Sequence, residues 1–326
     1  MATGEQIKNL IRAHYQNDTS RFQSISLQIA ASEARAGHHK IAKELKSIID
    51  KGSPVQKNFD KNGMSLSVKD ELDGSLQLKF TSIRKNEIVL SSSVQEHLEK
   101  VITEHKNALK LSEFGLTPRR KLLFHGLPGT GKTISAAMLA TELNMPFYAI
   151  LLDGLMSKYM GETAAKLRSI FNFISNNKAV YLFDEFDSIG SSRGHGNDIG
   201  EIKRVLNSFL VFFEEEQSDS IVIAATNHVE ALDNALFRRF DDVIEFDLPG
   251  ENEIKRLIQN KFALFKFKVK DWSAVFNASM GLSYAEIVKA CDDAAKEAIL
   301  NNNKTVSEDF LIQSLQSKTS IQRVTK

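Results

Sequence analysis

The chain of 326 residues has few of the features that mark several protein classes. It contains one cysteine, Cys291, which excludes an internal disulfide and a cysteine-rich zinc site and fits a reducing compartment. Its longest apolar runs, such as Phe147 to Leu152, span about six residues, whereas a membrane-spanning helix needs about 20. The N-terminus carries Glu5 and Lys8 and no apolar run, so we expect no secretory signal. We therefore expect a soluble, cytoplasmic protein without a membrane partner.

Excess charge of either sign is also missing. The chain has 42 Lys and Arg against 41 Asp and Glu, which leaves a net charge of +1. This balance disfavours nucleic acid as a partner, although a local basic patch stays compatible with it. At 42% hydrophobic and 25% charged residues, the composition is that of an ordinary globular protein, and the length suggests about two domains.

Hydrophobic spacing predicts two small regions before the main domain. Residues 1–51 place apolar side chains at steps of three and four, which predicts short helices. About fifty residues seldom form a core of their own, so we interpret this segment as one that recruits a protein substrate or a companion effector. Residues 52–86 are interrupted by glycine, proline and asparagine and read as a linker. Within the linker, Leu76 to Phe80 alternate like a strand.

Alternating strands and helices then predict an α/β domain over residues 87–250. A parallel sheet covered on both faces is the fold that such alternation favours, that is, a doubly wound αβα domain. We expect strands over 121–125, 147–152, 180–183, 221–225 and 243–246, and helices over 92–109, 132–143, 162–176 and 201–213. Glu214 to Glu216 are expected to form an exposed helix end.

Beyond Pro249 we expect no further strands. Helices are predicted over 251–265, 283–300 and 307–315, so residues 251–326 read as a small helical lid domain.

A glycine-rich run follows the first strand of the α/β domain. It reads Gly126-Leu127-Pro128-Gly129-Thr130-Gly131-Lys132-Thr133 and fits the pattern G-x-x-x-x-G-K-[ST]. Glycines let backbone N–H groups converge on phosphate oxygens, and the helix that follows points its positive end at the same anion. The alternative, an ordinary glycine-rich turn, is disfavoured because the run leaves a strand and opens a helix. The candidate ATP-binding residues are Gly126, Pro128, Gly129, Thr130, Gly131, Lys132, Thr133 and Ile134.

Polar side chains end two of the predicted strands. Val180 to Phe183 lead into Asp184 and Glu185, and ligand sites lie at the carboxyl ends of such strands. Asp184, together with Thr133, is a candidate Mg²⁺ ligand, directly or through water, and Glu185 would orient the attacking water. A solvated helix start is the alternative reading of the two acids. Asn227 ends another buried strand and could contact the γ-phosphate, or form a turn; Asp187 reads as structural.

These motifs together resemble the AAA family of ATPases. The segments are G-x-P-G-T-G-K-T, F-D-E-x-D, A-A-T-N and A-L-D-N-A-L-F-R-R-F-D, and the resemblance extends from Ser92 to Leu315. It implies an αβα nucleotide domain with a helical lid, ATP and Mg²⁺ as cofactors, and a homo-oligomer, usually a hexameric ring. Asn227 matches the polar sensor. Arg238 and Arg239 match arginine fingers that act on the neighbouring subunit's ATP; in isolation, a surface salt bridge is the alternative.

The resemblance extends to a pore loop and to the lid. Lys158, Tyr159, Met160 and Gly161 are similar to the family's first pore loop, in which the aromatic side chain grips an extended polypeptide. A buried tyrosine near a helix start is the alternative. The lid segment Gly281 to Glu286 resembles the signature G-x-S-x-A-[DE], which implies that Ser283 and Ala285 contact the nucleotide. No clear adenine-pocket motif is present, so Ile88 and Val89 are candidates by location only.

Two functions of different classes are compatible with these motifs. The first is ATP hydrolysis that drives protein remodelling or unfolding by a ring oligomer, with Tyr159 moving substrate through the channel. The second is a nucleotide-dependent scaffold or switch that regulates a companion enzyme without threading. No HExxH motif is present, so we expect no zinc protease activity. A DNA motor is disfavoured by the near-neutral charge.

Overall fold

The computed structural model describes residues 75–152, 162–187, 198–232, 234–301 and 305–325, together with positions 8, 11, 25, 26 and 29. The chain divides into two units, Met1–Lys69 and Asp70–Lys326. The fold below is that of the second unit. The helices predicted over 1–51 and most of the predicted linker lie outside the described residues.

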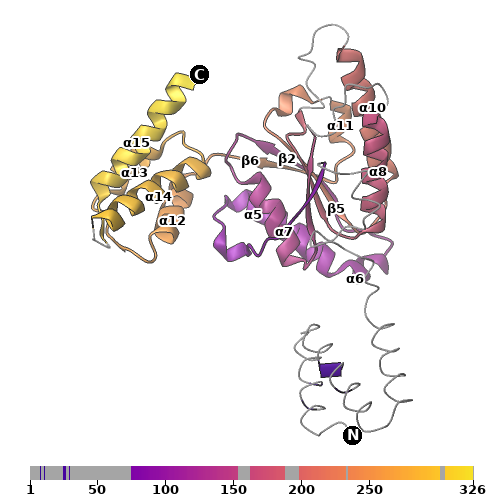
Figure 1. The fold of residues 1–326 in the computed structure, drawn as a ribbon, viewed down its shortest axis with the longest axis horizontal. Coiled ribbons are helices and arrows are strands. Elements are labelled where there is room, and N and C mark those ends of the chain that lie inside the picture. The colour runs from indigo at the N-terminus through magenta and orange to yellow at the C-terminus, as the bar shows by residue number, and fades with distance from the viewer. Residues whose placement is uncertain are drawn as a thin grey trace. The chain divides into compact units, whose positions relative to one another are not determined.

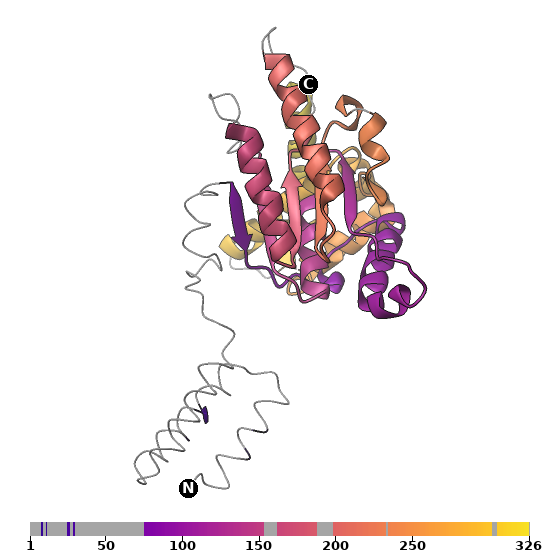
Figure 2. The ribbon, with the colours of Figure 1, turned by 90° about the vertical axis from the view of Figure 1, so that its right-hand side faces the viewer.

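A six-stranded sheet forms the centre of the second unit (Figures 1 and 2). Its strands are β1 (Leu76–Lys79), β2 (Lys121–Gly126), β3 (Phe147–Leu151), β4 (Val180–Asp184), β5 (Ile221–Thr226) and β6 (Asp242–Phe246). They lie in the order β1-β3-β4-β5-β2-β6. All neighbours are parallel except β1, which pairs antiparallel with β3 at the sheet edge. The predicted α/β class is confirmed, but the sheet is mixed rather than wholly parallel.

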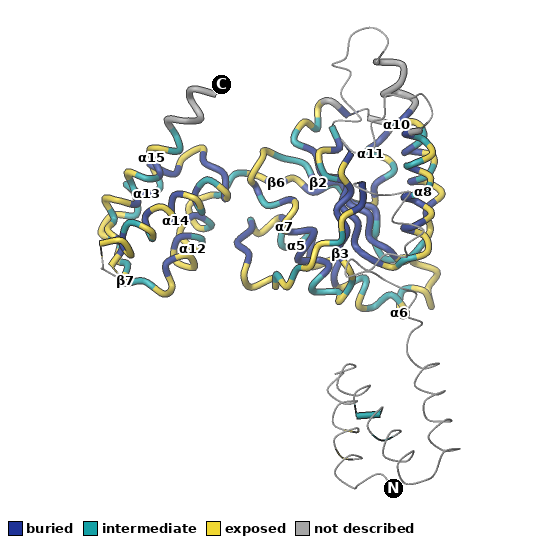
Figure 3. The backbone as a smooth tube through the Cα atoms, viewed as in Figure 1, coloured by how far each residue is buried: buried dark blue, intermediate teal, exposed yellow. Residues whose placement is uncertain are grey.

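Helices cover both faces of this sheet. The helices α5 (Ser92–Lys106) and α7 (Lys132–Glu142) share one apolar core with the sheet, in which Leu98, Leu122 and Leu139 are almost fully buried. On the opposite face, α8 (Glu162–Asn176) and α10 (Asp198–Glu215) run side by side (Figure 2). Their contacts with the sheet are largely aromatic, as in the stacking of Phe171 on Phe183. Figure 3 shows the strands as the most deeply buried part of this domain.

The acidic run at the end of α10 is exposed at Glu214 and Glu215, as the sequence predicts, but not at Glu216. Glu216 is 2% exposed, so the prediction of an exposed helix end is wrong for this residue. Its carboxylate accepts the backbone N–H of Ser218 at 2.6 Å and lies 3.4 Å from Arg120 Nη1. Lys121 Nζ donates to the carbonyl of Glu214 at 3.4 Å. Cations from the start of β2 thus compensate the buried acid and the negative end of the helix.

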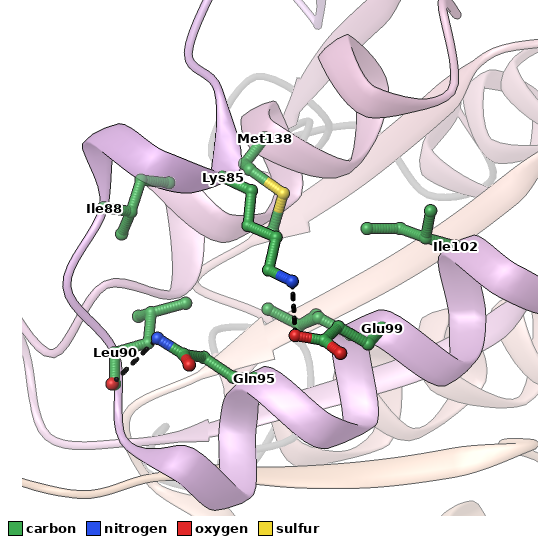
Figure 4. A pocket seen from close by; sticks show the side chains of 8 residues that line it. Lys85, Ile88, Leu90, Gln95, Glu99, Ile102 and Met138 are labelled. Carbon is green, nitrogen blue, oxygen red and sulfur yellow. Dashed lines mark hydrogen bonds and ion pairs between the residues drawn. The ribbon is translucent and has the colours of Figure 1, made fainter.

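The helix predicted over 92–109 is broken at Asn107. The short helix α6 (Ala108–Ser112) follows α5, and Asn107 between them has φ −111° and ψ 21°. The Asn107 side chain donates to the carbonyl of Thr103 at 2.8 Å, which competes with the continuing helix. Before α5, a 3-10 turn η1 (Lys85–Glu87) packs over it, and the Lys85 ammonium forms an ion pair with Glu99 (Figure 4).

The lid contains more elements than the sequence predicts. Its helices are α12 (Glu251–Lys261), α13 (Trp272–Ser279), α14 (Tyr284–Leu300) and α15 (Glu308–Thr325). The expectation of no strands beyond Pro249 is wrong, because β7 (Lys266–Phe267) pairs with β8 (Thr305–Val306) in parallel. The missed helix α13 has an N-cap, Asp271, which accepts the Ser273 N–H at 2.9 Å. A separate apolar core that includes Ile258, Ile287 and Leu311 holds the lid together.

Within the described ranges, none of the helices combines the length and apolar character that a membrane span requires.

Candidate active site

A cleft of about 640 Å³ lies at the carboxyl ends of the central strands. Ligands bind at this edge in open α/β sheets, and the volume is within the range of small-molecule sites. Its walls come from the loop after β2, from the ends of β4 and β5, from residues 87–90 and from the lid helices α12 and α14. The predicted residues that line it are Pro128, Gly129, Thr130, Gly131, Lys132, Thr133, Ile134, Asp184, Glu185, Asn227 and Ala285.

Close approach of other backbone and side chains explains two of the loop glycines. Gly126 has φ +140°, and a Cβ atom there would lie 2.2 Å from the carbonyl oxygen of Phe246 on β6. Gly129 has φ +77°, and its Cβ would lie 2.7 Å from Ser283 Oγ on the lid. Both values are shorter than any real Cβ contact. The loop glycines therefore serve packing against β6 and the lid as well as access for an anion.

Lys132 lies at the centre of the loop. Its ammonium donates to the carbonyls of Gly126 at 2.7 Å and Leu127 at 2.9 Å, and to Asn227 Oδ1 at 2.8 Å. Burial lowers the pKa of Lys132, and the carboxylates of Asp184 and Asp187 oppose that shift. Lys132 and the end of β5 are thus joined directly, a contact that the sequence did not predict.

Two side-chain oxygens that are suited to a metal ion lie beside Lys132. Thr133 Oγ1 donates to Asp184 Oδ2 at 3.0 Å, and both residues line the cleft. A hydroxyl and a carboxylate suit Mg²⁺, which usually binds only one or two protein oxygens alongside substrate phosphates. The residues present therefore fit the cation. In the described part of the chain, no cluster of three or more His, Cys, Asp and Glu residues forms.

Glu185 has an unusual backbone conformation. Its φ is +53°, which a side chain other than glycine adopts at a cost of roughly 1–3 kcal/mol. The Glu185 N–H donates to Asp184 Oδ1 at 3.0 Å, and the side chain is exposed on the cleft wall. The next residue, Phe186, is fully buried. The sharp turn therefore separates an exposed carboxylate from a buried ring.

The lid meets the loop at the start of α14. Ser283 is the N-cap of this helix and shares a capping box with Glu286, whose carboxylate accepts both the Ser283 N–H and its hydroxyl at 2.8 Å. The Ala285 N–H donates to the carbonyl of Gly129 at 3.1 Å. Ala285 lines the cleft, whereas Ser283, whose hydroxyl is engaged in the cap, does not.

Several residues of the cleft were not found from the sequence. The candidates Ile88 and Val89 line it, but so do Glu87, Leu90, Leu257, Lys261, Tyr284 and Val288. They form a largely apolar wall that is suited to a planar base. The available signal was the spacing on the lid helices, because Leu257 and Lys261, like Tyr284 and Val288, are four residues apart and share one helix face.

The two predicted arginine fingers lie outside the cleft and differ in their surroundings. They follow the short helix α11 (Asn234–Phe237). Arg239 Nε lies 2.5 Å from Glu214 Oε1 at the end of α10, and its side chain is 28% exposed. Arg238 is exposed and forms no ion pair with any residue that the structure describes. The pore-loop candidates Lys158, Tyr159, Met160 and Gly161 lie outside the described residues.

Comparison with known proteins gives this geometry a family. Residues 122–248 match the family described as "ATPase family associated with various cellular activities (AAA)". The chain is also 33% identical over 325 residues to "Uncharacterized AAA family ATPase y4kL" of Sinorhizobium fredii, and the match covers 98% of this chain and 96% of that protein. The chain belongs to the AAA family of ATPases. It is therefore an ATPase, and the αβα P-loop fold is that of the family.

More distant AAA relatives share only part of their length with the chain. It is 32% identical to a proteasome-activating nucleotidase of Methanoregula boonei over 68% of the chain and 53% of the relative. It is likewise 32% identical to the ATP-dependent zinc metalloprotease FtsH of Parabacteroides distasonis, of which it covers 34%. The chain thus spans about half or less of these relatives.

Proposed function

We propose that this AAA ATPase assembles as a ring of identical copies, a hexamer, and uses ATP hydrolysis to remodel or unfold proteins in the cytoplasm. The observation that carries the proposal is the position of Arg238. It is an exposed cation that lies outside its own chain's cleft, whereas the cleft itself contains Lys132 on the loop after β2 and Lys261 on the lid. A second cation at the γ-phosphate would then come from the neighbouring copy and stabilise the charge of the transition state in trans.

Within one copy, the cleft residues divide the work of hydrolysis. Lys132 and the loop N–H groups would hold the phosphates, and Thr133 and Asp184 would hold Mg²⁺. When bound, Mg²⁺ neutralises charge on the β- and γ-phosphates. Glu185 would orient and polarise the attacking water, with Asn227 beside Lys132 as the sensor. Ile88, Val89 and the lid residues Leu257 and Tyr284 would hold the adenine.

A protein is the substrate class that the relatives favour. Several carry names such as proteasome-activating nucleotidase or 26S proteasome regulatory subunit, which describe work on a protein-degrading assembly. The segment Lys158-Tyr159-Met160-Gly161 would grip an extended polypeptide in the ring channel. Residues 1–51 would recruit the substrate or a companion effector.

The test separates ATP hydrolysis from its mechanical output. Tyr159→Ala should keep the ATPase rate of the unstimulated enzyme within about threefold and lose ATP-dependent unfolding of a fluorescent reporter that carries an unstructured tail. Tyr159→Phe is the matched control. It should keep most of the unfolding activity, because the aromatic side chain that would grip the polypeptide is retained. The molecular mass of the protein in solution, measured with and without ATP, gives the number of copies in the assembly.

The same test can favour the second candidate. If Tyr159→Ala unfolds the reporter as fast as the unchanged protein does, threading by this residue is contradicted. A nucleotide-dependent switch on a companion enzyme would then explain the ATPase better.

A further inference from the structure

Two strands end side by side at the cleft, and each leads directly into a candidate catalytic side chain. β4 leads into Glu185 and β5 into Asn227, and the two strands are paired in register from Val180↔Ile221 to Phe183↔Ala224. Beyond that register, the backbone bond from the Phe186 N–H to the carbonyl of Ala225 at 2.8 Å still joins the two segments, but it does not reach Asn227. A further contact is needed to fix the position of Glu185 relative to Asn227.

Asp187 makes that connection. Its Oδ1 accepts the hydroxyl of Thr226 at 2.9 Å and the backbone N–H of Asn227 at 3.3 Å. Thr226 is 1% exposed, and its hydroxyl in turn accepts the backbone N–H of His228 at 3.0 Å. One carboxylate oxygen on the β4 side thereby fixes consecutive residues at the end of β5.

The residue before Asp187 is held by the same strand. The N–H of Phe186 donates to the carbonyl of Ala225 at 2.8 Å, and the ring centroid of Phe186 lies 4.7 Å from that of Phe209. Residues 186 and 187 therefore fold onto the end of β5. These contacts offset the left-handed conformation of Glu185, which persists only where the surroundings determine it.

The far end of this connection is the P-loop lysine. Asn227, held through its N–H by Asp187, uses its side-chain Oδ1 to accept from Lys132 Nζ at 2.8 Å. A continuous hydrogen-bonded series runs from Asp187 through Asn227 to Lys132 and on to the carbonyl of Gly126 at 2.7 Å. A shift of the Asp187 carboxylate would move Asn227 and the turn that carries Glu185 together.

We propose that Asp187 is a positioning residue for ATP hydrolysis: its carboxylate ties the end of β4 to the end of β5 and so holds Glu185 and Asn227 in their working arrangement. This role extends the sequence interpretation of Asp187 as a structural residue. The inference rests on the proposed roles of Glu185 and Asn227, not on remodelling. Misplacement of reacting groups by about 1 Å can lower a rate by about a hundredfold.

The experiment uses paired variants of the full-length protein. Asp187→Ala removes the acceptor, whereas Asp187→Asn keeps a side-chain oxygen at Oδ1. Thr226→Val removes the hydroxyl donor, whereas Thr226→Ser keeps it. Asp219→Asn removes a carboxylate that is 82% exposed and serves as the control for charge. The readouts are kcat and KM for ATP, the Kd of ADP, which is not hydrolysed, and the thermal midpoint.

A positioning role predicts a loss confined to turnover. Asp187→Ala and Thr226→Val should lower kcat by about ten- to a hundredfold and keep the ADP Kd within about twofold. Asp187→Asn and Thr226→Ser should recover most of that loss, and Asp219→Asn should turn over as the unchanged protein does. The proposal is overturned if Asp187→Ala keeps its kcat, or if kcat and ADP affinity fall together with the thermal midpoint.

Two further comparisons keep the result decisive. If Asp187→Ala does not fold, equal kcat values for Thr226→Val and Thr226→Ser overturn the proposal on their own. Glu185→Gln is measured in the same series. Normal hydrolysis by that variant would refute the assigned role of Glu185, whereas a dead Glu185→Gln beside a fully active Asp187→Ala would refute only the role of Asp187.

Discussion

The cleft has two halves that are built in different ways. The strand-end half carries Lys132 at the start of α7 and Asp184 and Glu185 at the end of β4, and hydrogen bonds between neighbouring strand ends help to fix these groups. The lid half is mostly apolar, with Leu257, Tyr284 and Val288, and meets the loop where the Ala285 N–H bonds the carbonyl of Gly129. The charged groups thus lie at the carboxyl ends of the strands, and the lid, which has an apolar core of its own, completes the apolar wall that Ile88 and Val89 also form.

Glu185→Gln tests the strand-end half and should have the largest effect. The amide cannot take a proton from water, so we expect the ATPase rate to fall at least about a hundredfold. Because the P loop is unchanged, the ATP Kd should stay within about threefold, as measured by titration with a fluorescent ATP analogue. A variant that loses binding and turnover in parallel would place Glu185 in binding rather than in water activation.

Gly129→Ala tests the junction between the two halves. The new Cβ would lie 2.7 Å from Ser283 Oγ and 3.0 Å from Ala285 Cβ, so the lid must move away from the loop. We expect ATP to bind about tenfold more weakly, which corresponds to about 1.4 kcal/mol.

Gly115→Ala is the matched control for Gly129→Ala. Gly115 also has a positive φ, +70°, but a Cβ atom at this position would have nothing within 4 Å of it. This variant carries backbone strain without a clash at the lid. Equal ATP affinities of the two variants would show that the lid contact contributes nothing to binding.

Glu286→Ala tests how firmly the lid half is capped. It removes the carboxylate that accepts the Ser283 N–H and hydroxyl, and the loss of a helix cap costs about 1 kcal/mol. If the whole unit Asp70–Lys326 melts as one, its melting temperature should then fall by about 2–4 °C in calorimetry. Glu286→Gln retains an acceptor and should restore most of the difference. Identical midpoints for both variants and the unchanged protein would refute the capping box as a source of lid stability.

The smallest effect expected is a pH dependence that arises far from the cleft. His105 on α5 bonds the carbonyl of Arg119 through Nε2 at 2.7 Å, and burial lowers the pKa of this histidine below its ordinary 6.5. The unfolded chain therefore binds more protons in that range, so stability is full above pH 6.5 and falls as the pH drops below it. His105→Gln keeps an N–H donor but does not titrate in this range. The melting temperature of this variant should therefore fall less than that of the unchanged protein as the pH drops below 6.5. An unchanged slope would contradict this.

The sheet could be predicted from sequence because its strands are buried apolar runs. An apolar run can be recognised as a strand without knowing its partner, as in Val180 to Phe183 and Ile221 to Ala225. Parallel pairing of the two strands then brings Asp184 and Asn227 to one edge of the sheet. The antiparallel pairing of Leu76 with Ile150 could not be predicted, since strand alternation does not specify a partner 74 residues away. The two-residue strands of the lid are likewise too short to leave a pattern.

The residues on the phosphate side of the cleft could also be predicted from the sequence, whereas those on the base side could not. Lys132 and Thr133 belong to a loop whose geometry requires a fixed spacing, so the motif identifies them. Leu257 and Val288 act through shape alone, and apolar lid residues that face a ligand look the same as those that face a core. The ion pair between Arg239 and Glu214 joins residues that are far apart in the sequence, so no local spacing predicts it.

The central claim, that one copy supplies the arginines for its neighbour's ATP, is tested most directly by mixing two inactive variants. Glu185→Gln keeps Arg238 and Arg239, and the double variant Arg238→Ala, Arg239→Ala keeps Glu185. In a mixed ring a site has both groups when the double variant lies beside a Glu185→Gln copy, so an equal mixture should recover up to about a quarter of the unchanged ATPase rate. If labelled copies exchange freely and the mixture stays inactive, the arginines do not act across the interface.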